Sequence, residues 1–237
     1  MPVITIVTVV FNALENLKLT AESVFKQTAW PDIEYIIVDG GSTDGTLAYL
    51  KTLPPVVRWI SEPDKGIYDA MNKGIRMASG EGLLFLNAGD YFVGDVITAD
   101  LTAPCFLPVK YQHPVLGYRP IRLKKRSEGL PNCHQGIVFE RKKELFYDLR
   151  YRISSDLDYY IRHGYGDRLP FHACSGFVHF DNSGANQKQA VLRDREIVEI
   201  IRKYFGFLPA SRFHLFALVK RLVRPMLVFV FEGKKSR

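Results

Sequence analysis

The chain has 237 residues, of which 47% are hydrophobic and 24% charged, so it can bury a sizeable core and is not expected to be disordered. Its three cysteines have no CxxC spacing, which argues against a disulfide framework and favours a reducing, cytoplasmic location. The first residues lead directly into an apolar strand, and no uncharged apolar run reaches about 18 residues. We therefore expect neither a signal peptide nor a membrane-spanning helix.

The net charge of +7 is concentrated near the end of the chain. From Arg202 onward there are nine Lys or Arg residues and one acid, Glu232, which leaves the preceding 201 residues with a net charge of about −1. This asymmetry argues against a nucleic-acid groove across the whole protein. It indicates that the end of the chain contacts an anionic surface.

The first 90 residues alternate between strand-like and helical patterns. The expected strands are residues 3–10, 34–39, 56–61 and 82–87. The expected helices between them are residues 14–28, 44–53 and 66–78. Because the strands are unbroken apolar runs, the pattern predicts an α/β fold with a mostly parallel sheet and helices on both faces.

The remaining residues are less regular. We expect strands at 117–124 and 137–140, a short helix at 155–163 with a serine N-cap, and a longer helix at 187–204. The composition changes near residues 205–209. The predicted organisation is therefore a domain of residues 1–206, with halves 1–92 and 93–206, followed by a basic amphipathic tail, 207–237.

Within the tail, one helical face is apolar. Its members are Leu215, Leu218, Val219, Leu222 and Met226. Basic residues occupy the other side, and Pro225 is expected to kink or end the helix. This pattern is typical of a helix lying on an anionic membrane. The alternative is a terminal helix that packs its apolar face on the body of the protein.

Polar residues follow each of the four expected strands, where an open parallel sheet binds its ligands. Asp39 follows the second strand and precedes Gly40 and Gly41; its carboxylate could accept a hydrogen bond from a nucleobase, or it could only form a turn. No GxGxxG or GxxxxGK[ST] motif occurs, so a dinucleotide fingerprint and a P-loop are not supported.

Asp90, after the fourth strand, is the best metal candidate, because a divalent ion bridging a diphosphate needs few protein ligands. The alternative is an aspartate that caps a turn. Asp156 and Asp158 open the short helix, where acids stabilise the helix dipole or, alternatively, supply a general base. His134 and Gln135 could bind phosphate or acceptor, although a packed, hydrogen-bonded histidine is the commoner arrangement.

Four motifs in this order resemble glycosyltransferase family 2, in particular the bacterial group of colanic acid, capsule and O-antigen synthesis. They are residues 7–12 (VTVVFN), 38–46 (VDGGSTDGT), 62–74 (EPDKGIYDAMNKG) and 85–90 (FLNAGD). The resemblance implies a GT-A fold, a UDP- or GDP-linked sugar donor, Mn²⁺ or Mg²⁺, and inversion at the anomeric carbon.

Site roles also follow from the resemblance. Nucleotide-binding residues would be Thr8, Asn12, Asp39, Asp64 and Lys65. The metal ligand would be Asp90 and the catalytic base Asp156, while Asn87, His134 and Gln135 would contact donor or acceptor. The chain departs from the family pattern in having one carboxylate where the DxD motif has two, and it has no QxxRW motif of processive synthases.

The expected function is therefore metal-dependent, inverting transfer of a sugar, of the hexosyltransferase type, onto an acceptor hydroxyl. The acceptor is expected to be a lipid-linked saccharide in bacterial surface polysaccharide synthesis, with the protein peripheral on the inner face of the membrane. A sugar nucleotidyltransferase is the rival enzyme, but the loop after the first strand lacks the basic, Gly-rich sequence that would hold a triphosphate. A catalytically weak nucleotide-binding or scaffold subunit is the remaining alternative.

Overall fold

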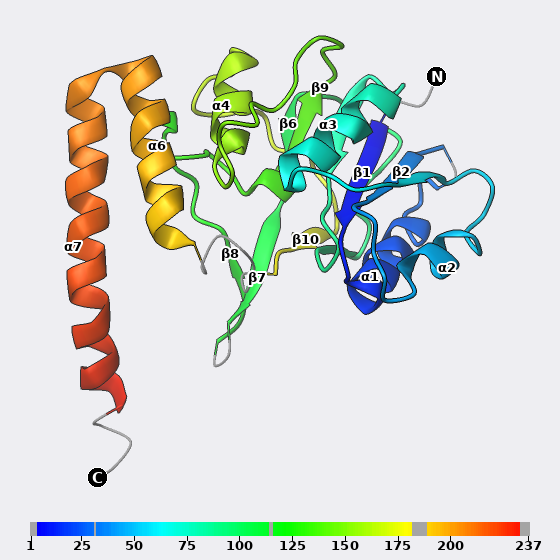
Figure 1. Ribbon diagram of the computed structural model, residues 1–237, viewed down its shortest axis with the longest axis horizontal. Helices are drawn as coiled ribbons and strands as arrows, with labels where there is room; N and C mark the ends of the chain where they lie inside the picture. The colour runs from blue at the N-terminus through cyan, green and yellow to red at the C-terminus, as the bar shows by residue number, and fades with distance from the viewer. Residues whose placement is uncertain (1–3, 31, 114–115, 182–188, 233–237) are drawn as a thin grey trace.

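The computed structural model describes residues 4–30, 32–113, 116–181 and 189–232, with side chains up to residue 219. Its main sheet has six strands in the order β3-β2-β1-β4-β9-β6 (Figure 1). Their bounds are β1 Ile4–Val10, β2 Glu34–Asp39, β3 Arg58–Ser61, β4 Gly82–Phe85, β6 Cys105–Phe106 and β9 Ile137–Glu140. The first four strands are parallel, and β9 runs antiparallel to both β4 and β6. The predicted α/β fold is confirmed.

Helices cover both faces of this sheet because successive strand residues point to opposite sides. Ile6 belongs to the core cluster that includes Leu17 of α1 (Leu14–Phe25), whereas its neighbour Val7 packs with Met71 of α3 (Ile67–Met77). The short helix α2 (Thr46–Leu50) lies beyond β2. The polar loops that follow β1, β2, β3 and β4 consequently meet at one edge of the sheet.

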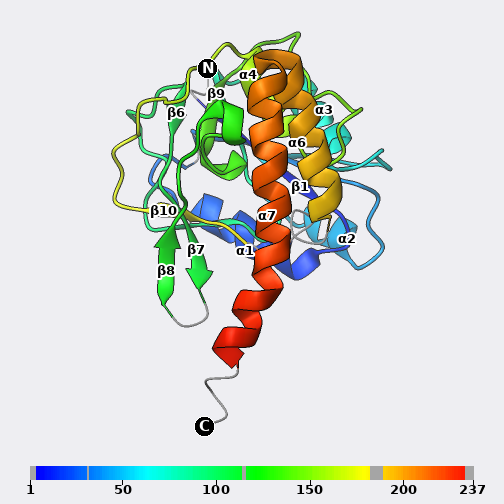
Figure 2. The same ribbon diagram turned by 90° about the vertical axis from the view of Figure 1, so that its left-hand side faces the viewer.

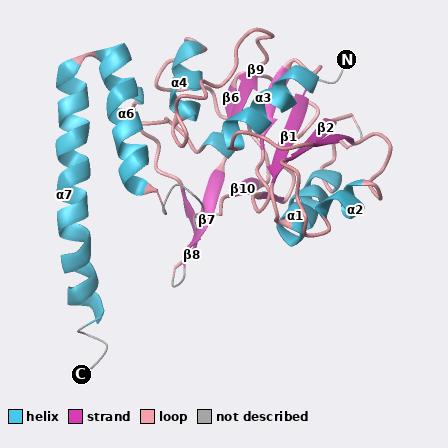
Figure 3. Ribbon diagram, in the orientation of Figure 1, coloured by secondary structure: helices cyan, strands magenta, loops and turns pink. Residues whose placement is uncertain are grey.

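The structure has a second sheet of four strands. The sequence predicted only one of these strands, at residues 117–124. Its order is β5-β10-β7-β8, with β5 Tyr91–Val93, β7 Val109–His113, β8 Gly117–Pro120 and β10 Phe177–His179. Because β5 begins directly after Asp90, this sheet extends from the ligand-binding edge of the main sheet. Figure 3 shows that loops connect most of the elements between β4 and α6.

Three helices and two short 3₁₀ turns complete the fold. They are η1 Arg126–Glu128, η2 His134–Gly136, α4 Ser155–Arg162, α6 Ala190–Phe205 and α7 Phe207–Glu232. Gly206, at φ 85°, joins α6 to α7, and both views show α7 running back alongside α6 and beyond it (Figures 1 and 2). Of the two outcomes expected for Pro225, a kink or an end of the helix, the end is wrong, since α7 continues to Glu232.

The entry into α4 is held by a residue of α6. Ser154 occupies the N-cap position, but its side chain does not cap the helix; its hydroxyl donates to the carbonyl of Arg193 instead. The carboxylate of Glu196 accepts hydrogen bonds from the backbone N–H groups of Arg152, Ile153 and Ser154 at 2.8–2.9 Å. The serine N-cap expected from the sequence is therefore corrected: the Ser154 side chain bonds to α6, and Glu196 of α6 satisfies the backbone N–H groups just before the helix, which would cost stability if buried without a partner.

Candidate active site

The loops after β1, β2 and β3 are in close contact. A Cβ atom on Gly40 would lie 2.5 Å from Oδ2 of Asp64 and 3.3 Å from Cδ2 of Phe11, so a larger residue here would displace the Asp64 carboxylate. Asn12, at φ 47°, donates its N–H to Ser42 Oγ at 2.8 Å and accepts from the N–H of Thr43 at 2.8 Å. These contacts bring Asn12, Asp39 and Asp64, three of the residues expected to bind nucleotide, to one place.

Asp39 lies at the bottom of this group with no exposed surface. Its carboxylate accepts hydrogen bonds from the hydroxyl of Ser42 and from Ser61 Oγ at 2.6 Å, and it also accepts from the N–H of Ser42. In this arrangement Asp39 orders the loop after β2. A nucleobase could reach the carboxylate only if Ser42 or Ser61 moved aside.

Thr8, Asp64 and Lys65 differ in their exposure. Thr8 is fully buried, and its hydroxyl is 3.1 Å from the Tyr35 hydroxyl within the core, so its position supports packing, contrary to the expected nucleotide contact. Asp64 is partly buried and accepts from the N–H of Gly66 at 2.8 Å. Lys65 is exposed. Only the latter two are accessible to a ligand here.

Two residues of this region were missed by the sequence analysis. Phe11 is 64% exposed beside Gly40, which places a bare aromatic ring next to Asp64. Lys73 of α3 is almost buried; its ammonium group pairs with Glu62 at 3.0 Å and donates to the carbonyl of Pro63 at 2.8 Å, which holds the loop after β3. An aromatic residue directly after a buried strand was the available signal for Phe11.

Asp90 lies at the end of the β4 loop and is 4% exposed. Its Oδ1 accepts from the N–H of Asp181 at 2.8 Å, and the Gln135 side chain also hydrogen-bonds to the carboxylate. Burial, reinforced by the negative charge of Asp181, raises the pKa of Asp90 to about 7. The loop itself is fixed by the hydroxyl of Thr20, which donates to the carbonyl of Asp90 at 2.8 Å.

Asp156 is partly buried in the first turn of α4. Its Oδ1 accepts from the N–H of Leu157 at 2.8 Å. The hydroxyl of Tyr68 from α3, which donates to the carbonyl of Ile153 at 2.7 Å, lies close enough to lower the pKa of the carboxylate. Burial raises the pKa of Asp156 to about 6, although the positive charge of Lys124 opposes the shift. A carboxylate with this pKa can accept a proton near neutral pH.

The thiol of Cys133 connects the two carboxylates. Burial raises its pKa, and the negative charges of Asp90 and Asp156 both add to the shift. Both negative charges therefore act on this thiol, which indicates that Asp90 and Asp156 lie in the same region of the fold. They are 66 positions apart in the sequence.

Asp158 has a structural role. It is completely buried, and its carboxylate pairs with Arg162 at 2.6 Å and Lys203 at 3.1 Å and accepts from the Tyr204 hydroxyl at 2.9 Å. The ion pair with Arg162 lies within α4, and the contacts with Lys203 and Tyr204 join α4 to α6. Of the two acids that open α4, only Asp156 is available to a substrate.

Comparisons with known proteins identify the family of this chain. The family model described as Glycosyl transferase family 2 matches residues 5–99. A PGL/p-HBAD biosynthesis glycosyltransferase of Mycobacterium bovis is 32% identical over 192 residues, which covers 68% of this chain and 69% of that protein. This chain belongs to glycosyltransferase family 2. The narrower colanic acid, capsule and O-antigen group is not confirmed, because this family 2 relative acts in PGL/p-HBAD biosynthesis according to its name.

Two further matches show how much of this chain is similar to known proteins. An uncharacterized glycosyltransferase of Mycobacterium tuberculosis is 46% identical over 99 residues, covering 41% of this chain and 38% of that protein. The match thus spans well under half of that relative. Among solved structures, the mannosyltransferase PcManGT from Pyrobaculum calidifontis, in complex with GDP-Man and Mn²⁺, has a TM-score of 0.61 at 17% identity, with 92% of this chain and 69% of that chain covered. At this identity the likeness shows the fold, which is that of GT-A glycosyltransferases.

The metal expected for a family 2 glycosyltransferase can be tested against the side chains around Asp90. Across the described residues, no group of three His, Cys, Asp or Glu side chains could hold a metal ion alone. Asp181 is close enough to Asp90 to raise its pKa, and Oδ1 of Asn87 is buried and has no hydrogen-bond partner in the described part of the chain. These oxygen atoms fit a hard divalent cation whose coordination is completed by phosphate and water.

His134 and Gln135 are neighbours in the sequence, but they have different roles in the structure. His134 is 6% exposed, its Nε2 is 2.7 Å from the Tyr147 hydroxyl, and its ring stacks on Phe85. Burial lowers the pKa of His134 to about 3, so it is neutral. The packed-histidine alternative therefore describes His134, whereas Gln135 supports Asp90 directly.

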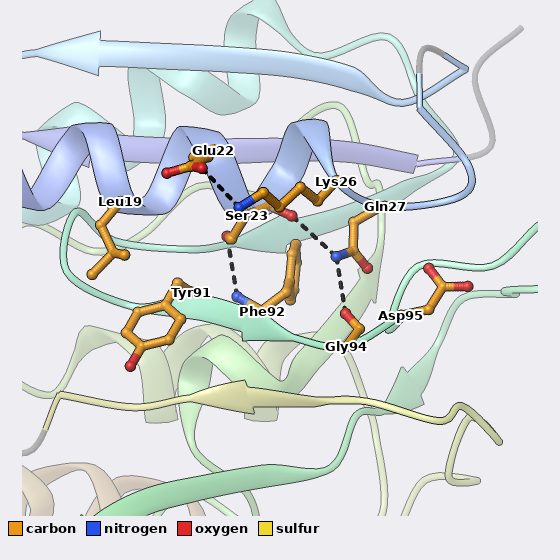
Figure 4. A pocket seen from close by; sticks show the side chains of 9 residues that line it. All are labelled: Leu19, Glu22, Ser23, Lys26, Gln27, Tyr91, Phe92, Gly94 and Asp95. Carbon is orange, nitrogen blue, oxygen red and sulfur yellow. Dashed lines mark hydrogen bonds and ion pairs between the residues drawn. The ribbon is translucent and has the colours of Figure 1, made fainter.

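A separate surface pocket of about 470 Å³ lies between α1 and β5 (Figure 4). Its polar groups bind one another: the Gln27 amide donates to the carbonyls of Ser23 and Gly94, and the Ser23 hydroxyl accepts from the N–H of Phe92. The pocket is lined by neither Asp90 nor Asp156. It does not provide a place for the nucleotide or the reacting groups of a family 2 enzyme.

Proposed function

We propose that this protein transfers a hexosyl group from a UDP- or GDP-linked sugar to an acceptor hydroxyl, with inversion at the anomeric carbon. The observation that supports the proposal is that two carboxylates, Asp90 and Asp156, both act electrostatically on Cys133, while the loops after β1 to β3 contact one another. The fold shared with a GDP-Man-binding mannosyltransferase supports a nucleotide-sugar donor.

In the proposed reaction, the acceptor oxygen forms a bond to the anomeric carbon as the bond from that carbon to the diphosphate breaks. The hydroxyl proton passes to the carboxylate of Asp156, and the electron pair leaves with the nucleoside diphosphate. Asp90, with Asn87 and Asp181 beside it, would hold Mn²⁺ or Mg²⁺, and a bound divalent ion stabilises negative charge on a leaving diphosphate. Gln135 would keep the Asp90 carboxylate oriented toward this position.

A panel of nucleotide sugars tests the function. The full chain is incubated with UDP- and GDP-linked hexoses and simple glycoside acceptors, and both released nucleotide and product mass are measured. One donor is expected to give a glycosylated product that requires the acceptor. Tight nucleotide binding without transfer from any donor would instead favour the scaffold alternative.

The pH dependence of kcat is the first prediction. Because Asp156 must be ionised to accept a proton, and burial raises its pKa to about 6, activity should be low when the group is protonated. We expect kcat to rise as the pH increases through about 6 and to level off above pH 7. Initial rates at saturating donor and acceptor from pH 5 to 8 measure this profile, and a rate independent of pH across that range would contradict the assignment.

Phe11 provides a test of donor binding. We place the nucleobase on its exposed ring, so Phe11→Ala should raise the donor KM about tenfold, since stacking of a base on an aromatic side chain contributes about 1–3 kcal/mol. Phe11→Tyr keeps the ring and should retain the wild-type KM. The matched control is Phe171→Ala, an exposed ring at the β6 edge of the sheet. An equal donor KM for Phe11→Ala and this control would exclude the stacking role.

We further propose that α7 holds the enzyme on the inner face of an anionic membrane, where it meets a lipid-linked saccharide acceptor. In the described part of α7, the large apolar side chains point outward: Leu215 is 63% exposed, Leu218 41% and Val219 49%. The buried side chains are the small ones, Ala210 and Ala217. The described part of α7 therefore argues against the alternative in which the apolar face of this helix packs on the body of the protein.

No helix in the described ranges is long and apolar enough to cross a bilayer.

The third prediction tests this surface. Replacing Leu215 and Val219 together with glutamine should reduce binding to vesicles of mixed neutral and anionic phospholipid at least tenfold, because burial of one such side chain contributes about 1.5–3 kcal/mol. Binding of the wild-type chain should weaken as salt increases. Val191→Gln is the control, since Val191 is 68% exposed on α6. Unchanged binding of the double variant, or dimer formation through α7 without vesicle binding, would overturn the membrane assignment.

A further inference from the structure

The four-stranded sheet has one buried face and one outward face that is rich in aromatic rings. Phe92 of β5 and Val178 of β10 are paired and point into the core, with 6% and 0% exposure. Their sequence neighbours Tyr91, Phe177 and His179 must point the other way, because side chains alternate along a strand. All three are partly exposed. A hairpin strand, β8, adds a further ring, Tyr118, which is 41% exposed.

These four rings form one continuous group, which we call the aromatic platform: Tyr91, Tyr118, Phe177 and His179. Tyr91 stacks on His179 with ring centroids 4.3 Å apart, and Tyr118 contacts Phe177 at 4.9 Å and His179 at 5.6 Å. The hydroxyl groups of Tyr91 and Tyr118 are 3.5 Å apart. The ammonium group of Lys110 lies over the Phe177 ring, 4.2 Å from its centroid. The platform therefore presents the apolar surface of its other rings together with two hydroxyl groups that can exchange hydrogen bonds.

The platform adjoins the proposed reaction centre through two of its members. Tyr91 directly follows Asp90 in the chain. His179 lies two residues before Asp181, whose N–H donates to Asp90 at 2.8 Å. The platform is therefore adjacent in the chain to the buried carboxylate of Asp90. Stacking of His179 on Tyr91 ties the positions of these two rings together.

A sugar ring has the matching chemistry. One of its faces exposes C–H groups, which pack on aromatic rings, and its rim carries hydroxyl groups that need hydrogen-bond partners. We propose that the aromatic platform binds a sugar ring of a saccharide acceptor and presents that acceptor to the reaction centre. The inference rests on the proposed function and names the substrate class of the same site: the acceptor is a glycoside, and its recognition is separate from that of the nucleotide.

The experiment measures saccharide binding without catalysis. Saturation-transfer NMR of the full chain with a panel of methyl glycosides, namely glucoside, galactoside, mannoside and rhamnoside, reports which sugar protons contact the protein. We expect at least one glycoside to show contact through its ring C–H groups, and Tyr118→Ala to weaken its Kd about tenfold or more. Tyr118→Phe should retain most of the contact, because the ring remains.

Tyr111→Ala is the matched control. Tyr111 lies on β7 of the same hairpin, opposite Arg119, so alternation places it on the other face from Tyr118, and its removal should leave glycoside binding unchanged. The nucleotide Kd should be unchanged in every variant, which also verifies folding. No contact with any glycoside in the wild-type chain, or equal loss in the Tyr111 and Tyr118 variants, would overturn the platform. Absence of transfer in the donor panel, with glycoside contact intact, would instead overturn the proposed function alone.

Discussion

Replacement of Asp156 with asparagine should lower kcat by about 10²–10⁴-fold, the usual contribution of a general base, with little change in donor KM. Asparagine has nearly the same shape as aspartate and can still accept from the N–H of Leu157, so the first turn of α4 should keep its geometry. What the variant loses is the ability to take the acceptor proton. Steady-state kinetics with the donor identified by the panel measure both parameters.

Asp158→Asn is the informative comparison for this prediction. Asp158 also lies in the first turn of α4, but its carboxylate is buried and forms ion pairs with Arg162 and Lys203. Removing its charge breaks both ion pairs at a buried position, so the variant should lose thermal stability, while the folded fraction keeps a kcat near that of the wild type. A large loss of kcat in folded Asp158→Asn, together with near-normal Asp156→Asn, would reverse the assignment of the base.

Local patterns in the sequence were sufficient to predict the first half of the fold. The bounds of β2 and β9 agree with the expected strands, because buried strands are continuous apolar runs and polar turns mark their ends. The four-stranded sheet was mostly missed. Its strands β5 and β10 have three residues each and are paired across more than 80 positions, so neither length nor periodicity distinguishes them from loops.

In the candidate site, too, some features could be predicted from the sequence and others could not. Asp90 and Asp156 could be selected because carboxylates at strand ends and helix starts are chemically suited to bind metal and accept protons. Whether a polar side chain faces the ligand or the core depends on tertiary contacts. Thr8 meets the buried Tyr35 hydroxyl and His134 meets the Tyr147 hydroxyl, so both lie inside the protein. Phe11, by contrast, is 64% exposed, with its ring next to Gly40.

Replacement of Asp90 with alanine should abolish detectable transfer and leave the fold intact. Loss of the metal carboxylate removes several kcal/mol of leaving-group stabilisation, which corresponds to a rate loss of roughly 10³-fold or more. The fold should tolerate the change because burial already opposes the charged form of this group, as its raised pKa shows. Circular dichroism and thermal unfolding monitor the fold, and nucleotide release monitors transfer.

Metal binding can be measured independently of turnover. In the wild-type chain, titration of Mn²⁺ in the presence of the nucleoside diphosphate product should show saturable binding, and a chelator should stop the reaction. Asp90→Ala should lose this binding, whereas Asp167→Ala, which removes an exposed carboxylate paired with Arg126, should retain it. Full activity of Asp90→Ala, or full activity of the wild type in excess chelator, would show that charge on the leaving diphosphate is stabilised by other groups, such as Lys124, whose positive charge reaches Asp156.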